Sequence, residues 1–210
     1  MSFTVRALGQ NCFLFVMNGF SLCIDPYFTE SIINLPGCEN FHRLIPVIIE
    51  PEELEADMIF CTHDHIDHLD PETIKRAEKV SLFVGPTSCA EHFKLLGIDR
   101  EKVLMLNRGG LFNTNGAVIR AVYADHTQDS VGIVLNCDGV TVYITGDSLY
   151  NDKLLSVKEF SPDVMIGCIN GKLGNMNYKE SAKLALNLGV RVSIPCHYGM
   201  FKDNTENPGK

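Results

Sequence analysis

The segment that decides the fold is Thr62-His63-Asp64-His65-Ile66-Asp67-His68, in which five of seven residues are His or Asp. It follows Met58–Cys61, an apolar run that is typical of a buried strand. It precedes Asp70-Pro71-Glu72, which is typical of a helix start because Asp caps the first turn and Pro fits the first helical position. The histidines are therefore expected on a strand-to-helix loop. Alternate side chains of an extended loop point to the same side, so they can converge.

Imidazole and carboxylate groups at this density suit zinc or another first-row divalent ion. Three further residues of ligand type, His126, Asp147 and His197, each stand just beyond an apolar run that predicts a strand. Loops that follow regular elements are where functional side chains concentrate, so these three are candidate ligands as well. The alternative for the segment by itself is a solvated acidic loop with incidental histidines.

The rest of the chain predicts strands in pairs and then strands alternating with helices. Asn18-Gly19 and Asp138-Gly139 indicate hairpin turns, because both turn positions favour positive φ. The remaining strands are expected at Cys12–Met17, Phe20–Ile24, Val80–Val84, Val103–Leu106, Ala117–Tyr123, Val131–Cys137, Val140–Thr145, Val164–Cys168 and Arg191–Ile194. Helices are expected at 71–79, 87–96, 152–160 and 178–188. This order favours an α/β fold of two mixed sheets covered by helices.

Composition limits the function classes. The chain has 210 residues, is 45% hydrophobic and carries a formal charge of −8, which suits one globular domain over 1–210. Without a run of Lys or Arg, an acidic chain is not expected to bind nucleic acid or an anionic membrane, and a small-molecule substrate is expected instead. Eight cysteines without a Cys-x-x-Cys pair indicate free thiols in a reducing cytoplasm.

The spacing His-x-His-x-Asp-His, then a lone His, then Gly146-Asp147-Ser148, then a late His, resembles the metallo-β-lactamase superfamily. The resemblance extends from Ile24-Asp25-Pro26 to His197 and implies a four-layer αββα sandwich, two mixed β-sheets flanked by helices. Three further segments resemble the branch that contains the L-ascorbate-6-phosphate lactonases, the UlaG-like hydrolases. They are Asp129-Ser130-Val131-Gly132, Asn170-Gly171-Lys172 with Gly174-Asn175-Met176, and His197-Tyr198-Gly199-Met200-Phe201.

The resemblance implies two divalent metal ions, with zinc favoured and manganese or iron left open. It implies one group of ligands for each ion and one carboxylate between them. The first ion would be held by His63, His65 and His126, the second by Asp67, His68 and His197, with Asp147 bridging. Asp67 and Asp147 would also be the catalytic carboxylates.

The activity so implied is hydrolysis of a small ester or lactone, such as a phosphorylated sugar lactone, by a metal-bound hydroxide. Diiron oxidoreductases of the superfamily usually carry Glu at the position of His65, so His there favours hydrolysis. A phosphodiesterase on a small phosphate diester and a catalytically silent metal-binding protein remain as alternatives.

The remaining site residues are open between two interpretations. Asn170, Lys172 and Tyr198 are candidate substrate contacts, although Lys172 equally suits a solvated loop. Asp25 is either the acceptor of a ligand histidine's ring N–H or a plain turn residue. Arg108 is a weaker candidate for substrate binding. The resembling branch usually continues into a helix after the late His, so a trimmed C-terminus or a surface completed by another copy of the chain is expected.

Overall fold

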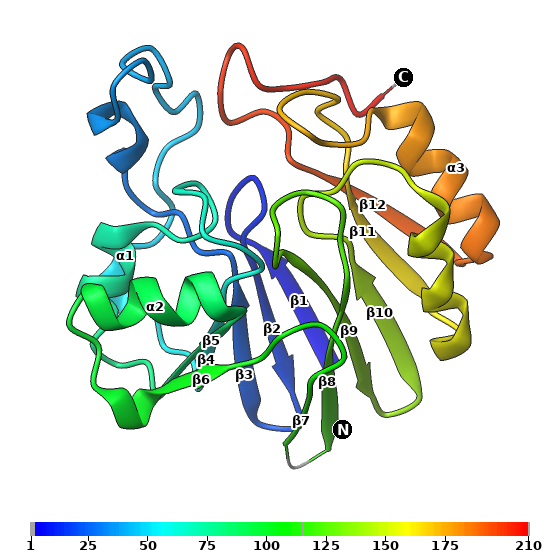
Figure 1. Cartoon of the computed structure of the whole chain (residues 1–210), viewed down its shortest axis with the longest axis horizontal. Helices are drawn as coiled ribbons and strands as arrows, with labels where there is room; N and C mark the ends of the chain where they lie inside the picture. Colours follow the sequence, from blue (N-terminus) through cyan, green and yellow to red (C-terminus); the bar gives the residue numbers. More distant parts are fainter. Residues whose placement is uncertain (1–2, 115, 210) are drawn as a thin grey trace.

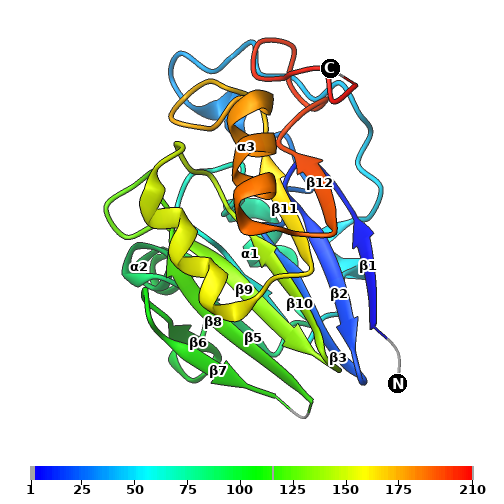
Figure 2. The ribbon, with the colours of Figure 1, turned by 90° about the vertical axis from the view of Figure 1, so that its right-hand side faces the viewer.

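The computed structural model describes residues 3–114 and 116–209. Two mixed sheets pack face to face, and helices cover the outer face of each (Figures 1 and 2). The α/β sandwich of four layers that the sequence predicts is therefore confirmed. Within the described residues, no helix is both long and apolar enough to cross a membrane.

The first sheet uses the first half of the chain, and its strands are adjacent in sequence order. The predicted Asn18-Gly19 hairpin joins β2 to β3, with φ of 49° and 87° at the two turn residues. The three strands β1 to β3 are antiparallel, and β3 to β6 are parallel. The bounds are β1 Phe3–Ala7, β2 Phe13–Met17, β3 Phe20–Ile24, β4 Met58–Phe60, β5 Leu82–Gly85 and β6 Val103–Met105.

The second sheet repeats this plan with the second half of the chain. Strands β7 to β10 are antiparallel, and β10 to β12 are parallel. Its bounds are β7 Leu111–Asn113, β8 Ala117–Tyr123, β9 Val131–Cys137, β10 Val140–Ile144, β11 Val164–Cys168 and β12 Val192–Cys196. Because β8, β10, β11 and β12 run the same way, their carboxyl ends meet at one edge of this sheet, the edge at which open α/β sheets commonly bind ligands.

The main core lies between the sheets and the helices lie outside them. Alternate residues of β2, Phe13, Phe15 and Met17, belong to the same buried cluster as Ile133 and Leu135 of β9. Helices α1 (Pro71–Arg76) and α2 (Thr87–Leu95) cover the first sheet, and α3 (Tyr178–Leu188) covers β11 and β12. A cap at Asn177 and a left-handed Gly189 fix the ends of α3 as predicted.

Two strands were not foreseen. The residues of β1, Phe3–Ala7, do alternate between apolar and polar, but the pattern covers only five residues and none of their side chains is fully buried. β7 has three residues and two of them are exposed. Pairing with β2 and β8 makes these short segments strands.

Other expected boundaries shift. The first helix ends at Arg76 instead of Lys79, because the chain turns to bury Ala77 and Val80. Asp152–Phe160 forms a 3₁₀ helix, since a period of three residues places Leu154 and Val157 on one buried face. The strand expected at 80–84 is β5, two residues later, and the last strand continues through Pro195, which an edge strand tolerates.

Gly85 fixes the distance between α2 and the strand that leads to the histidine loop. An added Cβ would lie 2.6 Å from Cys89 Cβ and 2.8 Å from the Cys61 carbonyl oxygen. We expect Gly85→Ala to lower the free energy of unfolding by about 1–3 kcal/mol, measured by urea denaturation. In the control Gly9→Ala the new Cβ would meet Met200 Cε at 3.4 Å, an ordinary contact, so less change is expected. Equal losses in both variants would contradict this.

Candidate metal centre

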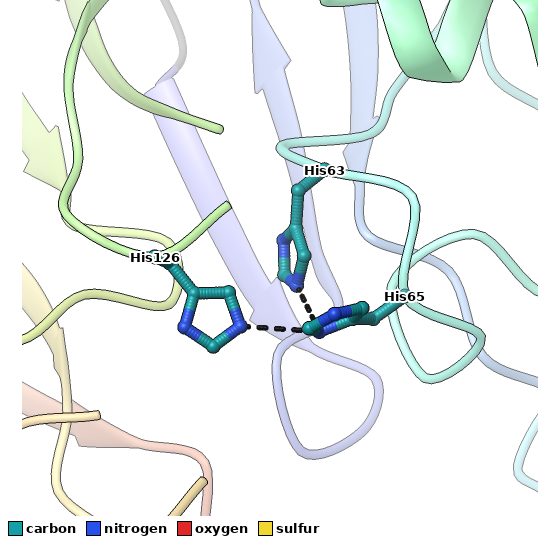
Figure 3. A group of neighbouring side chains, drawn as sticks. All are labelled: His63, His65 and His126. Atoms are coloured by element: carbon teal, nitrogen blue, oxygen red, sulfur yellow. Dashed lines mark hydrogen bonds between the residues drawn. The ribbon is translucent and has the colours of Figure 1, made fainter. Parts of the chain in front are cut away.

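Three histidines from both sheets form the first group of ligand-type atoms (Figure 3). His65 Nδ1 lies 3.0 Å from His63 Nε2 and 3.1 Å from His126 Nε2. His63 and His65 follow β4, whereas His126 follows β8. Lone pairs of three imidazoles aimed at one point repel each other unless a proton or a metal ion lies between them. The three ring nitrogens are close enough together to hold one metal ion.

A second group lies beside the first and Asp147 stands between them. His197 Nε2 is 3.6 Å from Asp67 Oδ2, and His68 Nε2 is 3.9 Å from the same oxygen. Asp147 Oδ2 is 3.2 Å from His197 Nε2 and 3.8 Å from His126 Nε2. The structure thus brings all seven sequence-predicted ligand residues together, and their coordination of metal stays a prediction for metal analysis to test.

The backbone is held in an uncommon conformation at two of these strand ends. Asp25, after β3, has φ of 46°, and His197, after β12, has φ of 60°. Residues other than glycine rarely adopt such angles, and they persist where surrounding contacts enforce them, often at functional sites. The backbone N–H of His197 donates to the carbonyl of Gln10 at 2.9 Å, and the backbone N–H of Asp25 donates to that of Phe60 at 3.0 Å.

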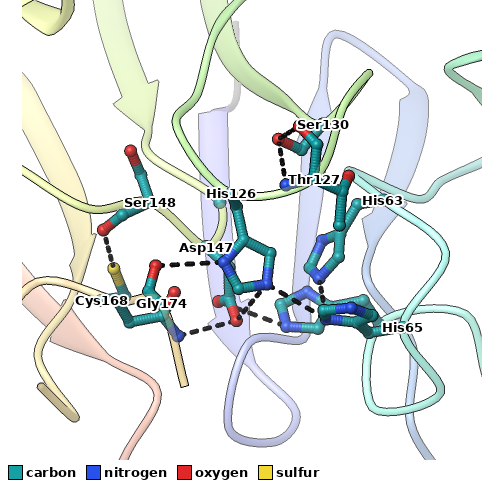
Figure 4. A network of polar contacts seen from close by, with 12 residues as sticks. His63, His65, His126, Thr127, Ser130, Asp147, Ser148, Cys168 and Gly174 are labelled. Atoms are coloured by element: carbon teal, nitrogen blue, oxygen red, sulfur yellow. Dashed lines mark hydrogen bonds and ion pairs between the residues drawn. The ribbon is translucent and has the colours of Figure 1, made fainter. Parts of the chain in front are cut away.

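The far nitrogen of several rings has its own partner. His68 Nδ1 lies 2.8 Å from the Asp25 carboxylate, which also accepts from the backbone N–H and hydroxyl of Thr62. His126 Nδ1 lies 3.1 Å from the carbonyl oxygen of Gly174 (Figure 4). Such partners fix the orientation of the ring and direct Nε2 toward the cluster. Of the two interpretations of Asp25, the geometry favours the acceptor of a ring N–H.

Three side-chain amides at the site were missed by the sequence analysis as functional residues. Gln10 Nε2 donates to Asp67 at 3.1 Å, and Asn175 Nδ2 donates to Asp147 at 2.7 Å. Asn11 Nδ2 lies 3.0 Å from His68 Nε2. Amides have no distinctive spacing. For Gln10 and Asn11 the available signal was a polar Gln-Asn pair between apolar runs, which could not be placed because β1 was not predicted. For Asn175 it was the segment Gly174-Asn175-Met176, to which no side-chain role was assigned.

The electrostatics of the site favour cations. Burial lowers the pKa of His63 well below its usual range, and the neighbouring His68 lowers it further, so His63 stays neutral and able to ligate. Burial also disfavours protonated His68, but Asp147 and Asp25 outweigh it and hold the His68 pKa well above its usual range. Burial would raise the pKa of Asp147, yet His197 and His68 hold it well below its usual range. The carboxylates therefore attract positive charge that a metal ion can supply.

The donor set fits divalent metal ions by a further observation. Asp147 Oδ1 is buried and has no hydrogen-bond partner, although buried polar atoms are nearly always satisfied. It lies 3.3 Å from His68 Nε2, without the geometry of a hydrogen bond. No described Lys or Arg pairs with Asp147, Asp67 or Asp25. A cation shared by the two groups would satisfy this oxygen.

Of the three predicted substrate-contact residues, two bind the C-terminal loop of the chain and the third lines a cavity. Asn170 is buried and donates to Asn204 Oδ1 at 2.7 Å, while Lys172 Nζ donates to the carbonyl of Asp203 at 2.8 Å. Both therefore hold the C-terminal loop. Tyr198 is half-buried and lines a cavity of about 380 Å³ together with Gln10. Their contacts with a substrate stay predictions.

The side chain of Arg108 is held by contacts within the protein. Its guanidinium donates to the carbonyls of Ser130 and Ala124 at 2.9 and 3.0 Å, so it braces the loop that carries His126. It also stacks on Tyr123, with its Cζ 4.8 Å from the ring centroid. These contacts support a positioning role for Arg108, and its contact with a substrate stays a prediction.

Comparison with known proteins gives the same class as the geometry. The model of the beta-lactamase superfamily domain matches residues 4–197. The chain is 28% identical over 203 residues to the UPF0173 metal-dependent hydrolase SSO0099 of Saccharolobus solfataricus, covering 94% of this chain and 85% of that protein. A second UPF0173 metal-dependent hydrolase, from Archaeoglobus fulgidus, is 28% identical over 92% of this chain and 82% of its own length.

Among solved structures, the fold is similar to Igni18, a metallo hydrolase from Ignicoccus hospitalis. The TM-score is 0.72 with 22% identity, over 99% of this chain and 87% of that one. These observations define a two-sheet fold with a histidine and aspartate cluster at one end. The chain belongs to the beta-lactamase superfamily domain family.

The Asp25–His68 contact is expected to tune metal affinity. Asp25→Asn removes the anionic acceptor of the ring N–H, so we expect metal affinity to fall about 10- to 100-fold in chelator competition. Asp57→Asn is the matched control, because Asp57 also accepts from a backbone N–H and a hydroxyl, both of Ser21 at 2.7 Å, but touches no histidine. Equal loss of affinity in the two variants would contradict a role for Asp25 at the metal centre.

Proposed function

We propose that this protein is a hydrolase that binds two divalent metal ions and cleaves a small ester or lactone. Zinc is the metal that we favour for both ions. The observation that carries the proposal is the position of Asp147, 3.2 Å from His197 of one group and 3.8 Å from His126 of the other. The name of its relatives, metal-dependent hydrolase, supports the reaction class. It does not identify the substrate.

When bound, a pair of divalent metal ions lowers the pKa of water and polarises the carbonyl oxygen of a substrate. The protein's own residues would hold that pair in place. Asp25 and the Gly174 carbonyl orient the rings of His68 and His126. Asn175 and Gln10 donate to the carboxylates of Asp147 and Asp67, which prevents these anions from turning away.

The chain also determines from which side a substrate approaches. His63, His68 and His197 are at most 1% exposed, so they close the inner side of the cluster to water. His65 is exposed, so a substrate would reach the cluster past this ring. The approach of a carbonyl group from the side of His65 requires no movement of the buried ligands.

Cys196 and Ser148 are potential nucleophiles beside the candidate ligands His197 and Asp147. Neither side chain is in the state that covalent catalysis needs. Burial raises the pKa of the Cys196 thiol well above its usual range, so it stays protonated. The Ser148 hydroxyl donates to the Leu149 carbonyl at 2.9 Å and accepts from the Asp125 backbone N–H. This favours attack by water over attack by a side chain.

The finer assignment follows the UlaG-like segments. A phosphorylated sugar lactone is one member of the proposed substrate class. Lys172, exposed on the loop after β11, would supply a cation for its phosphate by exchanging the Asp203 carbonyl for the phosphate. Manganese is then the alternative to zinc. The inventory of ligands is the same for both metals, so metal analysis decides between them.

The test combines elemental analysis with a substrate panel. Protein purified without added metal is expected to hold two divalent ions per chain and to hydrolyse lactones or aryl esters. Asp147→Ala is expected to lower kcat/KM at least about 100-fold, since it removes the carboxylate between the groups. The control His42→Ala changes an exposed histidine outside the cluster, and its activity is expected to match wild type.

Two results would overturn the proposal. Turnover of bis-para-nitrophenyl phosphate with no turnover of any ester or lactone would assign a phosphodiesterase. Metal-loaded protein that turns over neither class would assign a catalytically silent metal-binding protein.

A further inference from the structure

An apolar cavity opens beside the metal centre. It has a volume of about 470 Å³, within the range of small-molecule sites. The motif loop, the start of α1 and the end of α2 form its walls, and Leu35, which follows the 3₁₀ helix Ser31–Asn34, completes them. Its lining includes His65, so the cavity and the first ligand group share one ring.

The wall chemistry is aliphatic. Ile66, Leu69 and Leu96 contribute to the lining, and Leu35 and Leu95 at its edge are 42% and 82% exposed. Exposing several large apolar side chains around one hollow is unfavourable in water unless something covers them. The charged or titratable lining residues are Asp64, His65 and His92, so the described lining contains no Lys or Arg to hold a phosphate.

We propose that this cavity binds the apolar acyl group of the ester that the metal centre cleaves, and that Leu35, Leu95 and Ile66 determine chain-length preference. The inference rests on the proposed hydrolase function and narrows its substrate class to esters with an aliphatic acyl chain. Continuity with the metal centre supports this occupant, because a group in the cavity lies against the one exposed ligand ring, His65.

Two other cavities fit this role less well. A hollow of about 610 Å³ lies around Asn18 and Phe112, at the turn end of β2 and β3, opposite the metal centre. The cavity of about 380 Å³ at Gln10 and Tyr198 adjoins the side of the site where His197 is 1% exposed. Neither includes an exposed ligand.

The kinetic test uses para-nitrophenyl acetate, butyrate and hexanoate with metal-loaded protein. Each methylene buried in the transition state is expected to raise kcat/KM up to about fourfold. The hexanoate-to-acetate ratio is therefore expected to exceed about tenfold in wild type. Leu95→Gln, at the edge of the cavity, is expected to lower that ratio at least about threefold.

A matched control exists on α3. Leu186 is also 82% exposed and helical, but it lies outside the cavity, so Leu186→Gln is expected to keep the wild-type ratio. A ratio near one in wild type, or the same fall in both variants, would overturn the cavity assignment while leaving the hydrolase intact.

A binding measurement separates the cavity from the activity. Hexan-1-ol titrated into ¹⁵N-labelled metal-loaded protein is expected to shift the backbone amide signals of Leu95, Leu96 and Ile66, more weakly in Leu95→Gln. Such shifts without any ester turnover would support the cavity and contradict the hydrolase. Shifts confined to Ile45 and Ile48, at the Tyr198 cavity, would overturn the assignment.

A second copy of the chain is the other molecule that would cover the exposed leucines of the cavity. Sedimentation velocity tests for it. We expect wild type and Leu95→Gln to sediment alike. A dimer that Leu95→Gln, but not Leu186→Gln, converts to a monomer would show that the exposed leucines form a subunit interface and would overturn the proposal.

Discussion

The structure depends on three carboxylates held at one end of the fold without a lysine or arginine partner among the described residues. Asp25 and Asp147 are buried, and Asp67 is largely covered. Burying negative charge is costly, and the histidines and amides that contact these carboxylates offset only part of that cost. Divalent cations would remove the remaining part of this cost, and that part would then contribute to the free energy of metal binding. The site is therefore prepared for metal at the expense of the stability of the metal-free chain.

The two-sheet topology explains why this arrangement forms. The first sheet supplies the ligands from His63 to His68, and the second supplies His126, Asp147 and His197. Metal ions shared between these groups would join loops of the two sheets beyond the hydrophobic core that packs them. Metal binding and the packing of the sheets are consequently coupled, as expected when a site exists only in the folded state.

Much of this could be predicted from the sequence where the signal is local. The Asn18-Gly19 turn, the Asn177 cap and the histidine loop each depend on residues within a few positions, and the structure has the turn, the cap and the loop where expected. The strand β1 depends on pairing with β2, and its alternating pattern covers only five residues with no buried side chain, which is too short a signal to predict a strand. Because that strand was absent from the prediction, the amide of Gln10 had no place at the metal centre.

The apolar cavity is the clearest case of a feature invisible to sequence. Leu35 and Leu95 are sixty positions apart and appear in the sequence as ordinary surface leucines. Isolated exposed leucines need no explanation, and neither residue would attract attention alone. The fold brings both leucines into the lining of one cavity, Leu95 from the end of α2 and Leu35 from the segment that follows Ser31–Asn34. Their proposed role in substrate selection therefore follows from their position beside His65, since apolar surface beside a reactive centre selects substrates as well as excluding water.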